Sequence, residues 1–187
     1  MSNYSLKRYS AVCSCDDFVK SCVNVEKFLK LCKECRNYGN NWMCPPFDFD
    51  PMDVWKRYDT VRLEAVQIVP AQTTKRLCCD VTVYAYDILT EVKKKLRAEL
   101  LEEEKKIKGS MSFYAGSCDV CAECARIRGE KCRFPETARH SIESIGADVS
   151  IAVKKYLGLD ILWIKDCKLP EYLTLAAALL VPKQESI

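Results

Sequence analysis

A run of cysteines at every third position dictates how the middle of this chain can fold. Cys118, Cys121 and Cys124 form the run, and Cys132 follows after seven intervening residues. Charged residues surround these cysteines, which is unusual for cysteines that serve as small apolar residues in a core. Thiolates at this spacing converge when their loop wraps around a metal. We therefore expect residues 118–135 to form a metal-binding loop.

An iron–sulfur cluster is the centre that this spacing favours. Such clusters are held by four cysteine thiolates, often in a C-x2-C-x2-C run that is closed by a cysteine next to a proline. In bacterial ferredoxins the last gap is shorter and the proline follows directly. Here Pro135 stands three positions after the fourth cysteine. Our first interpretation is a [4Fe–4S] cluster on Cys118, Cys121, Cys124 and Cys132. Because the spacing differs from that of bacterial ferredoxins, the sequence does not fix which metal is bound.

A second group of cysteines lies in residues 32–46. Cys32 and Cys35 form a C-x2-C pair, the shortest spacing that places two thiolates on one metal. Gly39 allows the turn that brings Cys44 back toward them. We expect these three cysteines to ligate a second metal. Three thiolates leave one position for a further residue, or an open position for a substrate.

The remaining cysteines have less defined roles. Cys13 and Cys15 are either metal ligands or cysteines without a functional role, and the sequence favours neither alternative. Cys22 lies on the apolar face of a predicted helix, so we expect it in the core. Cys78 and Cys79 are adjacent, and we expect them to pack rather than to ligate. Cys167 is expected to be structural, with ligation as the alternative.

His140 is the only histidine, and we expect it at the surface. Without a second histidine or a nucleophile that partners it, hydrolytic chemistry is not indicated. Glycine motifs of the G-x-x-x-x-G-K-[ST] and G-x-G-x-x-G types are absent, so phosphate-binding loops are not supported either.

Composition narrows the class of protein. The chain has 187 residues, enough for one domain with a real core, and 13 cysteines. Residues 1–12 are polar and lack the apolar segment of a secretory signal, and no run is long enough to cross a bilayer. We therefore expect a cytoplasmic protein, in which abundant cysteines bind metal more often than they form disulfides. The net charge of +3 is made of mixed acids and bases, so neither nucleic acid nor a membrane is expected as a partner.

Hydrophobic periodicity predicts an α+β fold. Residues 1–187 are expected to form a single metal-binding domain. Its mixed or antiparallel sheet of about four or five strands packs with helices, and the cysteine loops lie at one edge. Residues 1–15 are expected to be irregular. We expect helices over 16–32, 51–58, 88–107, 135–145 and 148–157, and strands over 60–69, 111–115, 161–164 and 173–181.

The two cysteine motifs together resemble those of an uncharacterised prokaryotic family of predicted metal-binding proteins (domain-of-unknown-function family twenty-two eighty-four). The resemblance covers most of the chain and implies seven cysteine ligands and no established reaction. This sequence differs from the family at Phe134, where histidine is common, and at His140, where proline is expected. The first motif is Cys32-x2-Cys35-x2-Tyr38-Gly39-x2-Trp42-x-Cys44-Pro45-Pro46, and the second runs from Gly116 to Val149.

Three classes of function fit these features. The first is an iron–sulfur protein with one or two clusters that transfers electrons to a redox partner protein, with an open cluster iron that acts on a substrate as its enzymatic variant. The second is a structural zinc protein in which Cys32, Cys35, Cys118 and Cys121 form one site. Cys124 argues against zinc, which needs only four ligands. A metal chaperone shares every feature, and the sequence sets no oligomeric state.

Overall fold

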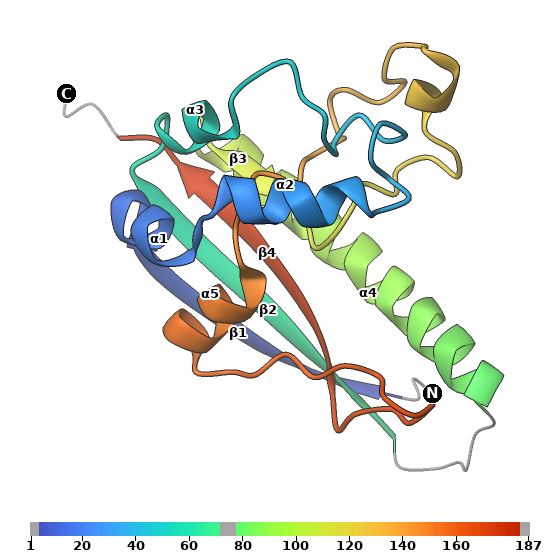
Figure 1. Ribbon diagram of the computed structural model, residues 1–187. Coiled ribbons are helices and arrows are strands. Elements are labelled where there is room, and N and C mark those ends of the chain that lie inside the picture. The colour runs from blue at the N-terminus through green and yellow to red at the C-terminus, as the bar shows by residue number, and fades with distance from the viewer. Residues whose placement is uncertain (1–3, 72–77, 184–187) are drawn as a thin grey trace.

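A computed structural model describes residues 4–71 and 78–183, without the side chains of residues 78–80. Four strands of this part form one antiparallel sheet in the order β1-β2-β4-β3 (Figure 1). The prediction of an α+β fold is therefore confirmed. The strands are β1 (Tyr4–Ser14), β2 (Thr60–Pro70), β3 (Met111–Phe113) and β4 (Leu173–Val181), and the helices are α1 (Cys15–Cys22), α2 (Val25–Lys33), α3 (Pro51–Trp55), α4 (Cys78–Lys106) and α5 (Val149–Leu157).

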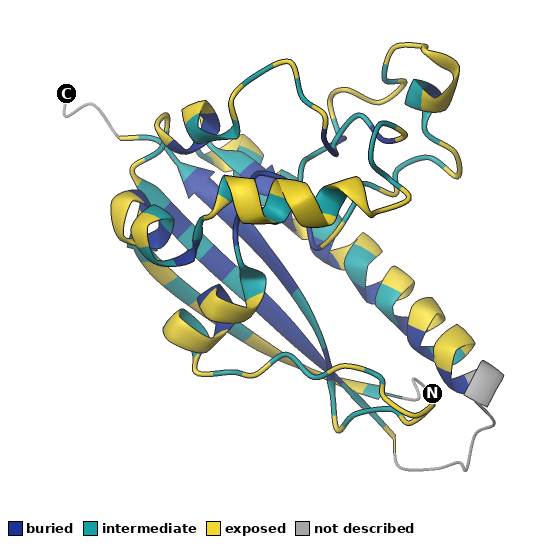
Figure 2. Cartoon of the chain, in the orientation of Figure 1, coloured by how far each residue is buried: buried dark blue, intermediate teal, exposed yellow. Residues whose placement is uncertain are grey.

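The two central strands separate two hydrophobic clusters (Figure 2). On one face, Val61 and Leu63 of β2 pack with residues of α1, α3 and α5. On the other face, Val66 and Ile68 of β2 pack against α4. Side chains of a strand point alternately to its two faces, so β2 places apolar residues on both faces, with Arg62 and Glu64 partly buried between them. The strands predicted over 60–69 and 173–181 are confirmed.

Strand β1 replaces the irregular segment that was expected over residues 1–15. It pairs with β2 along its whole length, from Tyr4 opposite Pro70 to Ser14 opposite Thr60. Because β1 lies at the edge of the sheet, most of its residues are exposed and its sequence is polar. The backbone hydrogen bonds to β2 stabilise a strand that its own side chains do not specify.

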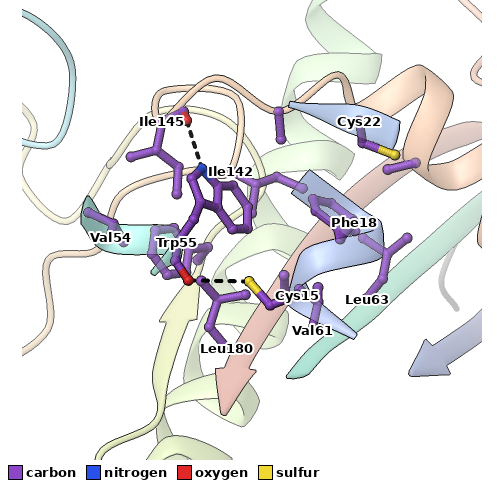
Figure 3. Packing of buried hydrophobic residues seen from close by; sticks show 14 residues of the cluster. Cys15, Phe18, Cys22, Val54, Trp55, Val61, Leu63, Ile142, Ile145 and Leu180 are labelled. Atoms are coloured by element: carbon purple, nitrogen blue, oxygen red, sulfur yellow. Dashed lines mark hydrogen bonds between the residues drawn. The ribbon is translucent and has the colours of Figure 1, made fainter. Parts of the chain in front are cut away.

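Trp55 lies at the centre of the first cluster (Figure 3). Its indole Nε1 donates a 3.0 Å hydrogen bond to the carbonyl of Ile145, and its ring stacks on Phe18 at 5.4 Å. The thiol of Cys15 donates to the carbonyl of Trp55 at 3.4 Å. Cys15 is therefore a core residue, and the core position predicted for Cys22 is confirmed.

The helix predicted over 16–32 is broken into α1 and α2. Val23 pairs with Ala147 in an isolated bridge, and the side chain of Asn24 accepts from the backbone N–H of Lys27 to begin α2. Gly146 has a φ of 98°, and a Cβ there would lie 2.8 Å from Cα of Val25. The turn that contains Gly146 thus sets where α2 begins and where it delivers the first cysteine loop.

Helix α4 confirms the long helix that was predicted, and it begins ten residues earlier, at Cys78. The packing expected for Cys78 and Cys79 lies outside the described side chains. Near the end of α4, the carboxylate of Glu104 accepts hydrogen bonds from Ser112 and Arg139. This carboxylate therefore joins α4, β3 and the segment that follows the second cysteine loop. None of the helices in the described ranges is both long and apolar enough to cross a bilayer.

Two further predictions of regular structure are wrong. Residues 135–145 form successive turns, because the backbone N–H of Tyr114 donates to the carbonyl of His140 and Ser141 forms a bridge with Tyr114. These contacts extend β3 and take the place of helical hydrogen bonds. Residues 161–164 have no strand partner within the described chain. Cys167, just beyond them, is disulfide-bonded, which agrees with its expected structural role.

Candidate metal centre

The first cysteine loop leaves the end of α2 as a series of tight turns. The backbone N–H of Cys35 donates to the carbonyl of Cys32 at 3.0 Å. Gly39 has a φ of 70°, and its N–H donates to the carbonyl of Pro45 at 2.8 Å. This hydrogen bond closes the loop and brings buried Cys44 back toward the C-x2-C pair.

The second cysteine loop is fixed at its start by α4. Lys93 donates a 2.5 Å hydrogen bond to the carbonyl of Ser117, and Asp119 pairs with Lys93 and with Arg97. A single 3-10 turn, η1 (Ala125–Arg128), separates Cys124 from Cys132. The four thiols of this loop are partly exposed and line a cavity of about 1310 Å³.

Arg126 of η1 clamps the two loops together. Its guanidinium donates to three carbonyls of the first loop, those of Asn41 at 2.9 Å, Cys44 at 2.7 Å and Pro46 at 2.6 Å. The same guanidinium lies 4.9 Å from the ring centre of Trp42, in cation–π contact. Two cysteine groups that are more than seventy residues apart in the sequence thus form one region (Figure 1).

Two more hydrogen bonds cross this boundary, and side chains of the first loop donate both. The amide of Asn41 donates to the carbonyl of Cys118 at 2.9 Å, and the indole of Trp42 donates to the carbonyl of Glu130 at 2.9 Å. Asn41 is itself buried, so its amide needs such a partner. The docking of the loops is therefore specific and does not depend on apolar contact alone.

His140 is not the surface residue that the sequence suggested. Its Nδ1 lies 3.0 Å from the carbonyl of Met43, and its ring packs edge-on to Phe47 at 5.0 Å. Burial lowers the pKa of His140, so the neutral ring donates to Met43. His140 therefore supports the first loop from the segment that follows the second.

Electrostatics links the thiols across the two loops. The pKa of Cys44 is raised to about 12, chiefly by burial and also by the neighbouring thiols of Cys35, Cys32 and Cys118, while Arg126 lowers it. Burial also raises the pKa of Cys32 and of Cys118. Cys44 thus lies within electrostatic range of both cysteine groups. A metal that binds these thiols has to displace their protons.

Comparison with known proteins agrees with this arrangement. A family model described as "Predicted metal-binding protein (DUF2284)" matches residues 19–181 and includes both cysteine loops. The chain belongs to this family. No curated protein matches this DUF2284 chain, and no solved structure does. The family assignment supports metal binding and names no metal and no reaction.

The donors of this DUF2284 chain fit a soft metal or an iron–sulfur cluster, because thiolates are the ligands that such centres prefer. Within residues 4–71 and 78–183, however, no three histidine, cysteine, aspartate or glutamate side chains lie close enough together to hold a metal ion. Ligation at either loop requires the thiols to turn toward a common centre. The residues expected as ligands are Cys32, Cys35 and Cys44 in the first loop and Cys118, Cys121, Cys124 and Cys132 in the second.

Cysteines outside the loops have other partners. The thiol of Cys13 contacts the carbonyl of Val61 at 3.9 Å, within the sheet. Cys15 and Cys22 are buried in the core, and burial raises the pKa of each to about 11. These three cysteines thus belong to the sheet and to the core beside α1 rather than to the loops.

Sequence reasoning missed the residues that assemble the region. Arg126 and Asn41 act through backbone carbonyls, and such contacts leave no pattern in a sequence. Glu143 lies within the second motif, and it lines the same cavity as the second-loop thiols. Burial raises the pKa of Glu143, and its Oε2 is buried without a hydrogen-bond partner among the described residues. Its place in a motif of metal ligands was the available signal.

Proposed function

We propose that this chain is an iron–sulfur protein with an electron-transfer role. A [4Fe–4S] cluster is assigned to Cys118, Cys121, Cys124 and Cys132, and a second centre to the three cysteines of the first loop. The docking of the two loops by Arg126 is the observation that carries this proposal. It gathers all seven motif cysteines into one region, as adjacent centres require. When bound, such a cluster supplies one-electron oxidation and reduction.

The surrounding side chains suit an anionic thiolate site. Arg126 brings a fixed positive charge to Cys44, where it favours the thiolate over the thiol. Trp42 lies partly buried between the loops and lines the cavity with the second-loop cysteines. An aromatic wall limits access of water, which tunes the potential of a cluster.

A redox partner protein and a cytoplasmic setting complete the proposal. Two apolar side chains of the second loop are exposed, Ile127 by 54% and Phe134 by 47%. They flank Cys132, so a protein that docks on them comes close to the cysteines. This placement supports a partner that exchanges electrons at the second loop.

Structural zinc is the second candidate. The proximity of Cys44 to Cys118 favours it, because a single zinc ion then draws its thiolates from both loops, as paired C-x2-C motifs do. The pairs Cys32/Cys35 and Cys118/Cys121 supply four ligands. The third cysteine of the triplet, Cys124, has no role in such a site.

Metal analysis of protein purified without oxygen tests the two candidates. We expect a brown protein with about four irons and four sulfides per cluster, and therefore about eight of each for two clusters. Zinc is measured on the same sample. A colourless protein with about one zinc and no acid-labile sulfide would refute the electron-transfer proposal and leave a structural zinc site.

A further inference from the structure

A cavity of about 1310 Å³ extends from the second cysteine loop along strand β4. Strand β3 pairs only with residues 178–180 of β4, so residues 173–176 have no strand partner on that side within the described chain. These residues line the cavity, together with Phe28 of α2 and Leu89 of α4. A concave and largely apolar site between secondary-structure elements is where small organic molecules usually bind.

Two residues of the cavity wall have a buried polar atom that lacks a partner. These atoms are Oε2 of Glu143 and Oγ1 of Thr174, and neither has a hydrogen bond to the described residues. The only other such atom in the described chain is Nε of Arg62, which is nonetheless ion-paired with Glu64 at 3.0 Å. Burying a polar atom without a partner is costly, so each case calls for an explanation. Because both unpaired oxygens belong to this one wall, a bound ligand explains them together.

Charge distinguishes Glu143 from the other ionisable residues of the wall. Lys93 pairs with Asp119 at 3.4 Å, and Lys27 pairs with Asp148 at 2.8 Å. Lys93 acts on Glu143 only through its charge, since no ion pair joins the two within the described residues. The carboxyl group of Glu143 is thus the buried acid of this wall that no described cation contacts. A ligand that suits it carries a positive charge and N–H donors.

Two exposed aromatic rings also line the cavity. Trp163 is 67% exposed, and Tyr86 is 64% exposed. The face of an aromatic ring attracts a cation, and aromatic rings are the usual means by which proteins recognise organic ammonium groups. The walls therefore combine an apolar floor, aromatic faces and an acid without a counter-ion, which suits an ammonium group on an apolar body.

We propose that this cavity binds a small organic ammonium ion. Its nitrogen pairs with the carboxylate of Glu143, and its apolar body lies along residues 173–176 of β4. Oε2 of Glu143 is itself shielded, so pairing requires the carboxyl group to turn toward the cavity. The inference deepens the proposed function, because the four second-loop thiols line the same cavity. A ligand there is held beside the proposed cluster, although its binding requires no metal.

Isothermal titration calorimetry of the full chain with phenethylamine tests this site. Phenethylamine carries a protonated amine at neutral pH, and phenethyl alcohol has nearly the same shape without the charge. We expect the amine to bind about tenfold more tightly than the alcohol, which is the effect of one hydrogen bond to a charged group. This comparison requires no substitution, so it remains decisive even where a variant fails to fold.

Substitutions locate the binding site. We expect Glu143→Gln to weaken phenethylamine binding about tenfold and to leave the binding of phenethyl alcohol unchanged. The matched control is Glu123→Gln, because Glu123 lines the same cavity but is exposed and paired with Arg128. Trp163→Leu changes an exposed ring and should weaken amine binding by about two- to fivefold. This variant locates the site if Glu143→Gln does not fold.

The outcomes separate this site from the proposed cluster. Equal affinities for amine and alcohol, unchanged amine binding in Glu143→Gln, or no binding of phenethylamine to the unmodified chain would overturn the ammonium site. None of these results changes the iron and sulfide content, which tests the electron-transfer proposal. Conversely, a chain that binds the amine but holds no cluster would overturn that proposal and keep the ammonium site.

Discussion

The guanidinium of Arg126 donates a 2.7 Å hydrogen bond to the carbonyl of Cys44, across the boundary between the two cysteine loops. Two further bonds from the same group reach Asn41 and Pro46. Cys44 is the thiol that interacts with members of both groups. Arg126 therefore controls how the proposed ligands are placed relative to one another.

Replacing Arg126 by alanine should separate the loops. Each hydrogen bond to a charged group contributes about 1.5–3 kcal/mol, so we expect at least a tenfold loss in metal affinity, since about 1.4 kcal/mol corresponds to tenfold. Competition with a chelator measures the affinity. Arg128→Ala is the control, because Arg128 pairs only with Glu123 and Glu130 of its own loop in the described contacts. Equal affinities of the two variants would contradict the clamp.

Serine substitutions should distinguish ligands from other cysteines. We expect Cys118→Ser and Cys121→Ser to lose the visible absorption of the proposed cluster, because serine replaces a soft thiolate by a poor ligand. Cys13→Ser should keep its iron, since Cys13 contacts the carbonyl of Val61 within the sheet. Iron and sulfide per chain give the measurement. Loss of iron in Cys13→Ser would argue that a cysteine outside the motifs is a ligand.

Glu104 should make stability depend on pH. Burial raises the pKa of Glu104, but the hydrogen bonds from Arg139 and Ser112 outweigh it and hold the pKa below its usual value of 4.5. The folded state therefore favours the carboxylate, and this stabilisation is present above pH 4.5 and is lost as the pH falls through the lower, folded-state value.

The variant Glu104→Gln measures this contribution. At pH 7 we expect it to lower the free energy of unfolding by about 3 kcal/mol, because it leaves Arg139 without its partner in a largely buried ion pair. The difference from the unmodified chain should shrink in urea unfolding below pH 4.5. Glu102→Gln, in an exposed pair with Lys105, should leave the free energy of unfolding essentially unchanged. A difference that does not change with pH would be evidence against this account of Glu104.

Gly146 should tolerate no side chain. Its φ is 98°, and a Cβ would meet Val25 at 2.8 Å, so we expect Gly146→Ala to destabilise the fold by about 3 kcal/mol. Gly158→Ala is the matched control, because Gly158 has a φ of 68° and nothing within 4 Å of its would-be Cβ. It should cost only about 1 kcal/mol, the penalty of the left-handed conformation alone. Thermal unfolding of both variants decides whether the contact with Val25 matters.

The elements that the sequence predicted are those whose own side chains specify them. Strand β2 is buried on both faces, and Ile88, Val92 and Leu96 repeat at one-turn spacing along α4. Strand β1 was missed because its polar sequence follows from its place at the edge. The break between α1 and α2 depends on Ala147, which lies more than a hundred residues away in the sequence.

The candidate site likewise combines features that the local sequence predicts with features that depend on distant contacts. The seven cysteines and the return of Cys44 through Gly39 follow from spacing, since thiolates must bind near one another. The joining of the loops does not follow from spacing, because Arg126 reaches carbonyls that every residue has. His140 was misjudged for a related reason, as its partner is the carbonyl of Met43.

Every acceptor of Arg126 in the first loop is a main-chain oxygen. Arg126 therefore holds the first loop through its backbone and through the ring of Trp42, and not through the side chain of Cys44. Position 44 is thus free to vary while the docking persists. A histidine or an aspartate at this position would present a different donor atom to the same place. A single substitution at a ligand position can therefore change which metal this site prefers, while the docking of the two loops stays the same.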